Sequence, residues 1–344
     1  MSERALPSGK LAPAALETRV LRYLGRRRAD VLLHAALGED AAAVSAGDLV
    51  CVLSSDPITG ATCEAGWYAV HVACNDVAAC GAAPVGVLLT LLFPPGAGES
   101  AFEAAMIDAD RAARELCVEI LGGHSESTPA VTRLVISATA VGVCPRARLT
   151  TSAGARSGDS LVLTKTAGLE GTAILAGDCF ERVAAALGAD LAARARAFTG
   201  ALSVVAEALA AVELGVTAMH DATEGGVLGA AYELAASSGV RLVVDAAAVP
   251  VAPETSAICR LAAVDPLRLI ASGALLATAR DGAALVAGLR ARGFSAAVIG
   301  RAEAGPPGLT LLGGGSAGGN GVDVPAPIVD ELWRARARLG VAGD

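Results

Sequence analysis

The residues in this sequence best suited to chemistry are carboxylates that stand at the ends of apolar runs or inside them. Asp40 ends the motif GED, Asp56 ends the run LVCVLSSD, and Asp76 follows Asn75 inside the apolar stretch AVHVACNDVAACGA. A carboxylate in so apolar a stretch is costly to bury without a partner. Because Mg²⁺ takes oxygen ligands and bridges phosphate groups, this set of carboxylates predicts a magnesium site.

Two glycine-rich motifs, LGGHSEST and HDATEGG, add polar groups that could hold a nucleotide. Backbone N–H groups of a glycine pair or of a helix start can bind phosphate oxygens. The sequence has no Walker motif, since its only Gly-Lys pair is followed by Leu11. A magnesium–nucleotide site of another kind is therefore predicted. Its further candidate residues are Gly122, Gly123, His124, Ser125, Glu126, Asp221, Thr223, Gly225 and Gly226.

Each of these motifs, taken alone, also has a structural explanation. Asp40 suits an ordinary turn, and Asp56, which precedes a proline, could simply start one. Thr223 could cap the helix expected to follow it. His124 and His220 could be structural histidines with satisfied hydrogen bonds. It is the combination of the motifs along the chain that favours a functional site.

Apolar residues at helical and strand spacing predict helices and strands in both halves of the chain. Expected helices cover 14–24, 66–79, 102–116, 171–176, 191–214, 226–237 and 283–293, and expected strands cover 49–54, 85–93, 134–143, 161–166, 241–245, 273–279 and 296–299. The stretch 144–160, rich in small, basic and turn-forming residues, separates the two halves. This mixture predicts an α+β fold built from two layered domains.

Composition excludes several classes of protein. Of 344 residues, 53% are hydrophobic and 3% aromatic, and Lys+Arg (27) against Asp+Glu (35) gives a formal net charge of −8. The apolar share excludes intrinsic disorder, and the acidic balance argues against a nucleic-acid partner. The uncharged stretch 77–98 contains three prolines, so we expect no membrane span, and the N-terminus lacks the apolar core of a secretion signal. We therefore expect a soluble, cytoplasmic protein, whose eight cysteines, without a C-x-x-C pair, are free buried thiols.

Six motifs in order along the chain resemble the AIR synthetase (PurM) superfamily. They are GEDAAAV, LSSDPITGAT, GWYAVHVACNDVAACGAAPVGVLLTLLFP, LGGHSEST, GLEGTAIL and HDATEGGVLGAAYELA. That superfamily includes AIR synthetase, selenophosphate synthetase, thiamine-monophosphate kinase and the hydrogenase maturation factor HypE. The motifs SGKL (8–11), GLEGTAIL (168–175) and ASGALLA (271–277) are most similar to its HypE-like, AIR synthase-related branch. The resemblance covers nearly the whole chain, from Gly9 to Leu332.

This resemblance implies a PurM-like two-domain fold with ATP bound at the cleft between the domains. The N-terminal domain (1–148) would pair with its twin in a homodimer whose strands form a joint β-barrel, and residues 158–344 would form a C-terminal α/β domain. Carried over by motif, the implied catalytic residues are Lys10, Asp76 and His124, with Lys10 approaching the terminal phosphate as a lid. The implied metal ligands are Asp40, Asp56, Asp76 and Glu126. The residues implied in binding ATP are Asn75, Gly122, Gly123, Ser125, Asp221, Thr223, Gly225 and Gly226.

The implied chemistry is the ATP-dependent phosphorylation of a carbonyl or amide oxygen, which turns a poor leaving group into a good one. In HypE the acceptor is a thiocarboxamide on the enzyme's own C-terminal Cys, whereas no cysteine follows Cys259 here, so we do not expect that reaction on this chain's own tail. The motif GGHSE also stands where HypE has a GGD-type motif, and it is more similar to AIR synthase-related proteins and FGAM synthetase.

We therefore predict a Mg-ATP-dependent enzyme that acts on a carboxamide-like oxygen of an unidentified small or protein-borne acceptor, with hydrogenase maturation as a candidate pathway. One alternative is a non-catalytic ATP-binding dimeric scaffold or regulator. The others are an AIR synthetase-type cyclo-ligase of the purine pathway and a folded paralogue with a decayed site. Neither a nucleic acid nor a membrane is an expected partner.

Overall fold

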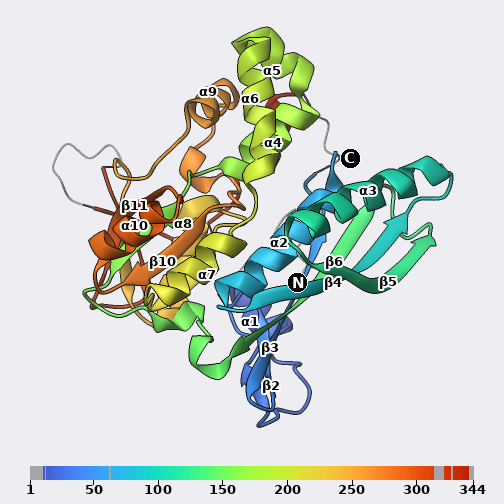
Figure 1. Cartoon of the computed structure of the whole chain (residues 1–344). Helices are drawn as coiled ribbons and strands as arrows, with labels where there is room; N and C mark the ends of the chain where they lie inside the picture. The colour runs from blue at the N-terminus through green and yellow to red at the C-terminus, as the bar shows by residue number, and fades with distance from the viewer. Residues whose placement is uncertain (1–10, 12, 62, 314–320, 327, 341–344) are drawn as a thin grey trace, which may run out of the picture.

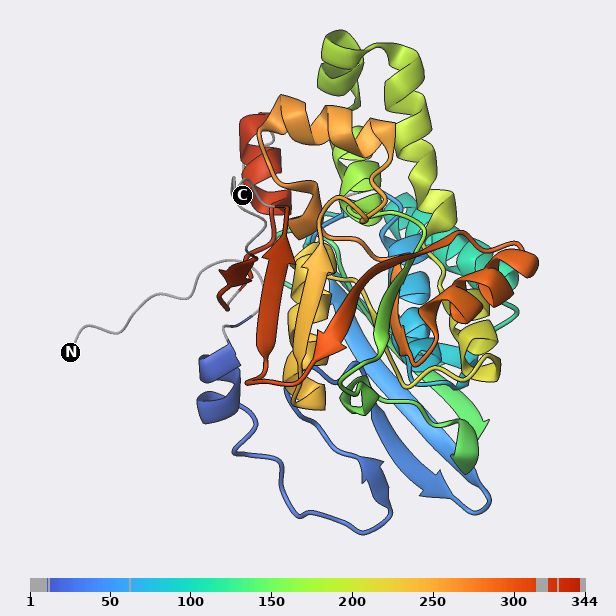
Figure 2. The same ribbon diagram turned by 90° about the vertical axis from the view of Figure 1, so that its left-hand side faces the viewer.

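The structure, a computed structural model, describes residues 11, 13–61, 63–313, 321–326 and 328–340. Within these residues each half of the chain forms one β-sheet, and helices cover the sheets (Figures 1 and 2). Helix α2 (Ala65–Ala79) lies between the two halves, because it contacts strands of the first sheet as well as a helix and a strand of the second half. The mixed α+β fold expected from the sequence is confirmed.

The N-terminal sheet has the strand order β1-β2-β3-β6-β4-β5. Neighbouring strands are antiparallel except β4 and β5, which run parallel. The strands are β1 (Val31–Leu33), β2 (Ala42–Ala46), β3 (Leu49–Ile58), β4 (Ala83–Phe93), β5 (Glu119–Ser127) and β6 (Val135–Pro145). Helix α1 (Pro13–Arg19) precedes this sheet, while α2 and α3 (Glu99–Glu115) pack together on one of its faces.

Helix α2 is buried along its whole length because it is covered on two sides. Alternate side chains of β3 and β6, such as that of Val52, point at it from the sheet. A Cβ on Gly142 of β6 would lie 2.2 Å from Cγ1 of Val77, so a glycine is needed for this close approach. An α-helix that is apolar all round is expected in such a buried position.

The opposite face of the N-terminal sheet carries large apolar side chains that are exposed in the single chain. Leu49, Leu88, Leu121 and Val143, from strands β3, β4, β5 and β6, are between 37% and 47% exposed. The β-barrel implied by the resemblance would cover this face with a second chain, and it stays a prediction.

The C-terminal sheet has the order β13-β12-β9-β11-β7-β10-β8, with only β9 and β12 parallel among the recorded pairs. Its strands are β7 (Ser160–Thr164), β8 (Ala218–Asp221), β9 (Arg241–Asp245), β10 (Leu275–Ala279), β11 (Ala296–Glu303), β12 (Gly308–Leu312) and β13 (Val322–Val324). The helices of this half are α4 (Leu169–Asp178), α5 (Phe180–Leu187), α6 (Ala189–Arg196), α7 (Val205–Glu213), α8 (Gly226–Ser238), α9 (Pro253–Ala262), α10 (Gly282–Ala291) and α11 (Leu332–Arg338). Helices α7 and α10 pack on one face of the sheet and α8 on the other, while α4, α5, α6, α9 and α11 group together.

The helix expected over 14–24 is shorter, since α1 ends at Arg19. Three other expectations about these elements are wrong, each for a tertiary reason. The helix expected over 191–214 is broken into α6, a 3₁₀ helix (Ala197–Ala201) and α7, and the side chain of Asn75 bonds the backbone in the gap. The strand expected to end at Ser54 continues to Ile58, because β6 pairs with it that far. The motif HDATEGG begins in strand β8 rather than in a loop, since its first two residues pair with β10.

Among the described residues, no single helix has the length and apolar character needed to cross a membrane. One bent pair, Ala189–Ala201 with Val205–Glu213, meets those criteria when its two parts are joined. The eight cysteines are free thiols, as expected, but Cys63 and Cys117 are exposed and Cys51 is half-buried, so the expected burial holds only for the other five.

Candidate functional site

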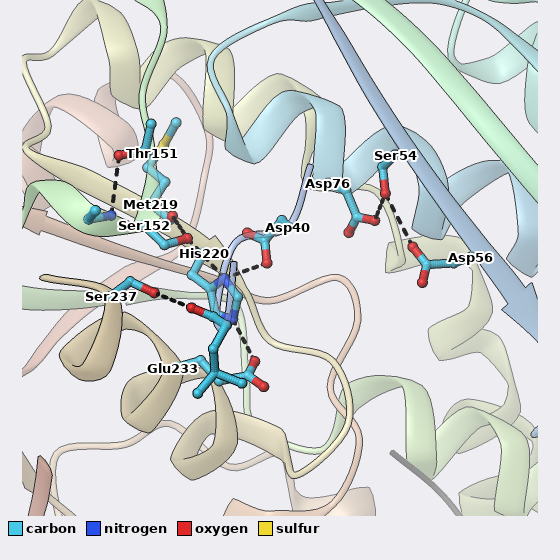
Figure 3. Close-up of polar contacts among 12 residues, drawn as sticks. Asp40, Ser54, Asp56, Asp76, Thr151, Ser152, Met219, His220, Glu233 and Ser237 are labelled. Carbon is cyan, nitrogen blue, oxygen red and sulfur yellow. Dashed lines mark hydrogen bonds and ion pairs between the residues drawn. The ribbon is translucent and has the colours of Figure 1, made fainter. Parts of the chain in front are cut away.

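Two carboxylates from neighbouring elements meet at one wall of a pocket between the two halves of the chain. Ser54 and Asp56 share a face of β3 because side chains alternate along a strand, and that face is turned toward α2. The Ser54 hydroxyl lies 2.5 Å from Oδ2 of Asp76 and 3.3 Å from Oδ2 of Asp56, in position to donate to either (Figure 3). This serine therefore holds Asp76 of α2 and Asp56 of β3 in one cluster.

Contacts with the C-terminal half bring Asp40 to the same wall. Its Oδ1 lies 2.5 Å from Nδ1 of His220, whose Nε2 lies 3.0 Å from Oε2 of Glu233 on α8 (Figure 3). The loop before β2 lies close against α8: Gly38 has a φ of +76°, and a Cβ there would lie 2.8 Å from the carbonyl oxygen of Glu233. Burial disfavours the charged imidazole, but Asp40 and Glu233 outweigh it and hold the pKa of His220 well above its usual value. His220 is therefore a buried cation that joins the two halves.

Asp221, which follows His220, is 1% exposed, and among the described residues neither of its carboxylate oxygens has a hydrogen-bond partner. Burial, followed by the charge of Asp40, raises the pKa of Asp221 to about 8, although His220 opposes this. Burial, then Asp221 and Asp56, raise the pKa of Asp76 well above its usual value. The carboxylates are crowded enough that a bound cation would stabilise their charged forms.

This crowding fits a divalent cation that brings further ligands of its own. Within the described part of the chain, no three His, Cys, Asp or Glu side chains are arranged to hold a metal ion by themselves. Mg²⁺ usually keeps several waters and takes one or two carboxylates together with phosphate oxygens. Asp40, Asp56, Asp76 and the unpartnered Asp221 suit that second kind of site, so the residues present fit magnesium bound together with a nucleotide.

The carboxylate cluster opens into a pocket of about 480 Å³ that combines acidic and apolar walls. Its lining comes from both halves: Glu39, Asp40, Asp56, Pro57, Ile58, Thr59, Gly60, Ala61, Val72, Asp76, Glu170, Ile174, Thr223, Glu224, Ile270, Ser272, Asp330, Leu332 and Trp333. No lysine or arginine is found among these described lining residues. A phosphate group would be repelled by this wall unless a cation came with it.

Several polar residues of the pocket are not among the candidates that the sequence indicates. Glu170 and Ser272 lie in GLEGTAIL and ASGALLA, two motifs that carry the family resemblance without a chemical reason for either residue. Glu224 lies inside HDATEGG, and only Thr223 beside it is a sequence candidate. Asp330 lies far along the chain in a segment without a motif, so nothing local in the sequence points to it.

The motif HDATEGG places one candidate, Thr223, in the pocket, and its two glycines allow a tight backbone turn at the start of α8. Thr223 lines the pocket and does not cap α8, whose N-cap residue is Gly225. Gly225 has a φ of +83°, and its N–H donates a 2.7 Å hydrogen bond to Oδ2 of Asp330. Gly226 has a φ of +61°, and a Cβ there would lie 2.6 Å from the carbonyl oxygen of Leu269. The N–H of Gly225 is thus engaged within the protein, and phosphate binding by this glycine pair stays a prediction.

The motif LGGHSEST lies on β5, the edge strand of the N-terminal sheet, outside the pocket of its own chain. Its candidates Gly122, Gly123, His124, Ser125 and Glu126 are all exposed. A Cβ on Gly123 would lie 1.8 Å from the carbonyl oxygen of Leu89, so strand pairing requires a glycine there. Nε2 of His124 lies 3.2 Å from Oε2 of Glu126. The structure does not bring these residues together with the aspartate cluster, and their roles toward ATP and metal stay predictions.

Asn75 joins the two halves of the chain through its side-chain amide. Its Nδ2 donates to the carbonyl oxygen of Leu202, and its Oδ1 accepts from the N–H of Val204, each at 2.8 Å. Because both ends of this buried amide are engaged, a phosphate would have to compete with them, and that role stays a prediction. Lys10, expected as a lid over the terminal phosphate, lies outside the described residues.

Two family descriptions match the chain: residues 38–144 match "AIR synthase related protein, N-terminal domain", and residues 156–311 match "AIR synthase related protein, C-terminal domain". A carbamoyl dehydratase HypE of Cupriavidus necator is 33% identical over 231 residues, which are 66% of this chain and 64% of that protein. The carbamoyl dehydratase HypE of Bradyrhizobium diazoefficiens is 31% identical over 248 residues, 70% of this chain and 69% of that protein. A crystal structure of the hydrogenase maturation protein HypE in complex with ATP shares the fold: it is 24% identical, with a TM-score of 0.69 over 95% of this chain and 97% of that one.

Proposed function

The chain belongs to the AIR synthase-related family, and on this premise we propose that it is a Mg-ATP-dependent enzyme of the HypE-like type. It phosphorylates or dehydrates a carboxamide-like oxygen on a substrate still to be identified. Its proposed context is hydrogenase maturation, because one relative, from Methanocaldococcus jannaschii, is named a putative hydrogenase expression/formation protein. The observation that carries the proposal is the meeting of Asp40, Asp56 and Asp76, from three separate segments, at one pocket wall. The matched regions support proposed domains of 1–148 and 158–344.

The charge of the pocket supports magnesium as the carrier of the nucleotide. With carboxylates and no described Lys or Arg on its wall, the pocket can accept a polyphosphate only when a cation screens it. Asp56 and Asp76 are the two proposed ligands that Ser54 already holds in one cluster. Asp40, oriented by His220, is the third.

ATP bound with magnesium would supply a γ-phosphoryl group that turns the carboxamide oxygen into a leaving group. The bond from the γ-phosphorus to the β–γ bridging oxygen breaks, a bond to the carboxamide oxygen forms, and ADP leaves. Departure of that oxygen as phosphate, with loss of the two nitrogen protons, leaves a nitrile-type carbon in a full dehydration. The chain itself positions the two reactants: the aspartate cluster would hold ATP through its magnesium, and the rest of the pocket would hold the carboxamide acceptor.

The exposed apolar face of the N-terminal sheet supports a homodimer. Leu49, Leu88, Leu121 and Val143 present large side chains on neighbouring strands, and contiguous apolar surface of this kind typically marks an interface. The edge strand β5 borders this face. In a homodimer, the exposed residues of LGGHSEST would lie next to the ATP site of the partner chain, whereas in the single chain they lie outside the pocket.

Calorimetry of ATP binding with and without Mg²⁺, together with ADP release in the presence of small carboxamides and thiocarboxamides, tests the proposal. We expect ATP binding to require Mg²⁺, and Asp76→Ala to weaken it by more than about tenfold. Asp48→Ala, in the exposed turn between β2 and β3, is the matched control and should bind normally. If both variants keep normal Mg-dependent ATP binding, the assignment of the aspartate cluster is refuted. Tight ATP binding without ADP release for any acceptor would favour a scaffold over an enzyme.

A further inference from the structure

The chain between α1 and β1 carries a dense group of arginines. Residues 19–28, with the sequence RVLRYLGRRR, hold five of the 27 Lys and Arg residues of the chain and none of its 35 Asp and Glu residues. We call this stretch the arginine segment. The rest of the chain is therefore more acidic than the formal net charge of −8 indicates, and the arginine segment is a local exception to the charge of the protein.

Most guanidinium groups of the arginine segment have no anionic partner among the described residues. All residues of 22–29 are exposed, and a Cβ on Gly25 would meet no atom within 4 Å. Nη2 of Arg28 lies 2.7 Å from Oδ2 of Asp30, and this is the one ion pair recorded for the segment within the described part of the chain. Four like charges are thus left facing solvent, those of Arg19, Arg22, Arg26 and Arg27.

Large apolar side chains lie among these charges. Val20, Tyr23 and Leu24 are 44%, 71% and 53% exposed. Cζ of Arg22 lies 4.7 Å from the centroid of the Tyr23 ring, so the guanidinium covers one side of the ring while most of the side chain stays exposed. Arg and Tyr are enriched where proteins bind one another, and exposed apolar side chains surrounded by polar ones mark interaction sites. The arginine segment therefore has the composition of a binding surface.

The same features indicate the chemistry of the partner. Guanidinium groups pair with carboxylates in a bidentate geometry, and the apolar side chains require apolar groups opposite them. A nucleic acid or an anionic membrane would present an extended array of negative charge, which the acidic remainder of the chain repels. Basic segments that bind membranes typically form an amphipathic helix, whereas residues 23–28 form neither helix nor strand. An acidic protein segment that also carries apolar side chains fits these features best.

The arginine segment lies apart from the surfaces already described. None of its residues is among the described lining residues of the pocket. Figure 2 shows the segment in blue at the lower left, between α1 and β1. The apolar face proposed for the homodimer belongs to strands β3, β4, β5 and β6. A partner that binds the arginine segment would therefore use neither the pocket nor that face.

We propose that the arginine segment is a docking site for a partner protein, and that it binds an acidic segment of that protein which also carries apolar side chains. Arg22, Arg26 and Arg27 pair with the carboxylates of the partner, and Tyr23 and Leu24 pack against its apolar side chains. This inference goes beyond the proposed function, because docking at this surface requires neither ATP nor magnesium.

Two fluorescent peptides of equal charge test the proposal, EELEEFEELEE and the glycine analogue EEGEEGEEGEE. Their binding to the full chain is measured by fluorescence anisotropy. We expect EELEEFEELEE to bind with a Kd on the order of 10 μM at about 100 mM salt, and the glycine analogue to bind at least about tenfold more weakly. Binding should weaken as the salt concentration rises, because ion pairs at an exposed surface are screened. Equal binding of the two peptides, or no binding of EELEEFEELEE up to about 1 mM, overturns the proposal.

Variants with matched charge locate the binding. The triple variant Arg22→Gln/Arg26→Gln/Arg27→Gln should bind EELEEFEELEE at least about tenfold more weakly than the wild type. Its control is Arg146→Gln/Arg260→Gln/Arg280→Gln, which removes three exposed arginines elsewhere and should stay within about twofold of the wild type. Equal losses in the two triple variants would show that only the overall charge matters, and would overturn the docking site.

The apolar part of the surface has its own variant. Tyr23→Ser/Leu24→Ser keeps every arginine, so it should remove the preference for EELEEFEELEE over the glycine analogue. A preference that survives this change contradicts the assigned role of the two side chains.

Other occupants of the surface are further outcomes of the test. Tighter binding of a single-stranded RNA of about 20 nucleotides, or of phosphatidylglycerol vesicles, than of EELEEFEELEE would overturn the proposal in favour of a nucleic acid or a membrane. A lower molecular mass of the Arg22→Gln/Arg26→Gln/Arg27→Gln variant in light scattering would overturn it in favour of a contact between copies of this chain. Mg-ATP binding by this variant should equal that of the wild type, so the docking site and the proposed function can fail separately.

Discussion

Oδ1 of Asp40 lies 2.5 Å from Nδ1 of His220, so a carboxylate from the loop before β2 is paired with an imidazole at the end of β8. The two residues belong to different halves of the chain, and Oε2 of Glu233 on α8 lies 3.0 Å from the other ring nitrogen, Nε2. This pairing joins the two halves of the chain at the edge of the pocket and fixes the carboxylate of Asp40 against His220 (Figure 3). The pairing of His220 therefore couples the stability of the fold to the geometry of the proposed magnesium site.

His220→Gln should destabilise the protein, because it leaves the carboxylates of Asp40 and Glu233 buried without their shared cation. Removing one partner of a buried pair costs about 3–5 kcal/mol. Urea unfolding measures this, and the double variant Asp40→Asn/His220→Gln should lose clearly less than the sum of the two single variants. Additive effects of the two changes would show that the pair does not act as a unit.

Asp76→Asn should stabilise the fold in the absence of metal while it weakens Mg-ATP binding. Burial and the nearby charges of Asp221 and Asp56 disfavour the Asp76 carboxylate, whereas a neutral amide can still accept from Ser54. The thermal midpoint in EDTA should rise by a few degrees, about 1 kcal/mol or more in stability. An unchanged or lower midpoint would mean that the cluster is not crowded by charge, and Asp48→Asn provides the reference for removal of an exposed carboxylate.

Asn75→Ala should destabilise the junction between the halves by about 2 kcal/mol or more, because it leaves the carbonyl of Leu202 and the N–H of Val204 unpaired in the interior. Asn75→Asp keeps an acceptor for Val204 and loses only the donor to Leu202, so its cost should differ from that of alanine. Chemical unfolding compares the three proteins. Mg-ATP affinity of the folded Asn75→Ala protein then decides whether the amide also holds phosphate, as the sequence predicts.

His71 should make stability fall as the solution becomes acidic. Its ring is fully buried beside Trp67, with 4.4 Å between the ring centroids. Burial, and then the charges of Lys165 and Arg111, lower the pKa of His71 to about 4. Oε1 of Glu115 lies 3.9 Å from Nε2 of His71. The unfolded chain binds this proton near pH 6.5, the folded chain only near pH 4. Stability from His71 is therefore complete above about pH 6.5 and is lost below it, by about 2 kcal/mol at about pH 5.

His71→Phe keeps an aromatic ring against Trp67 and removes the titration. Its unfolding free energy relative to the wild type should therefore rise between pH 7 and pH 5 by about 2 kcal/mol. The difference between the two proteins isolates His71 from the other titrating groups. A difference that stays constant with pH would show that His71 is protonated in the folded state already.

Leu88→Glu should convert a dimer into a monomer, because it places a charge in the middle of the exposed apolar face of the N-terminal sheet. Ile107→Glu is the matched control: Ile107 is 60% exposed on α3, which packs on the opposite side of that sheet. Sedimentation or light scattering measures the mass of each protein. A monomeric wild type, or dissociation by Ile107→Glu instead, would contradict the proposed interface.

Local pattern was enough to locate α2, β4 and β9, since their apolar residues recur at the period of a helix or form continuous buried runs. The same reasoning identified Asp76 as unusual, because a carboxylate in an entirely apolar helix needs a partner. These features depend on neighbours in sequence, and so the sequence by itself determined them.

The tertiary structure alone decided which distant groups meet. Nothing near Asp40 in the sequence indicates that His220 will pair with it, and nothing near Glu170 indicates that its carboxylate will share a pocket with Asp330. Asn75 shows the same limit, because its amide matches a phosphate-binding motif locally and yet bonds the backbone that breaks the expected helix over 191–214. The physical reason is that hydrogen bonds and Coulomb interactions act over a few ångströms in space. The separation of two residues along the chain does not give their distance in space. That distance is set only when the two sheets pack around the buried helix α2.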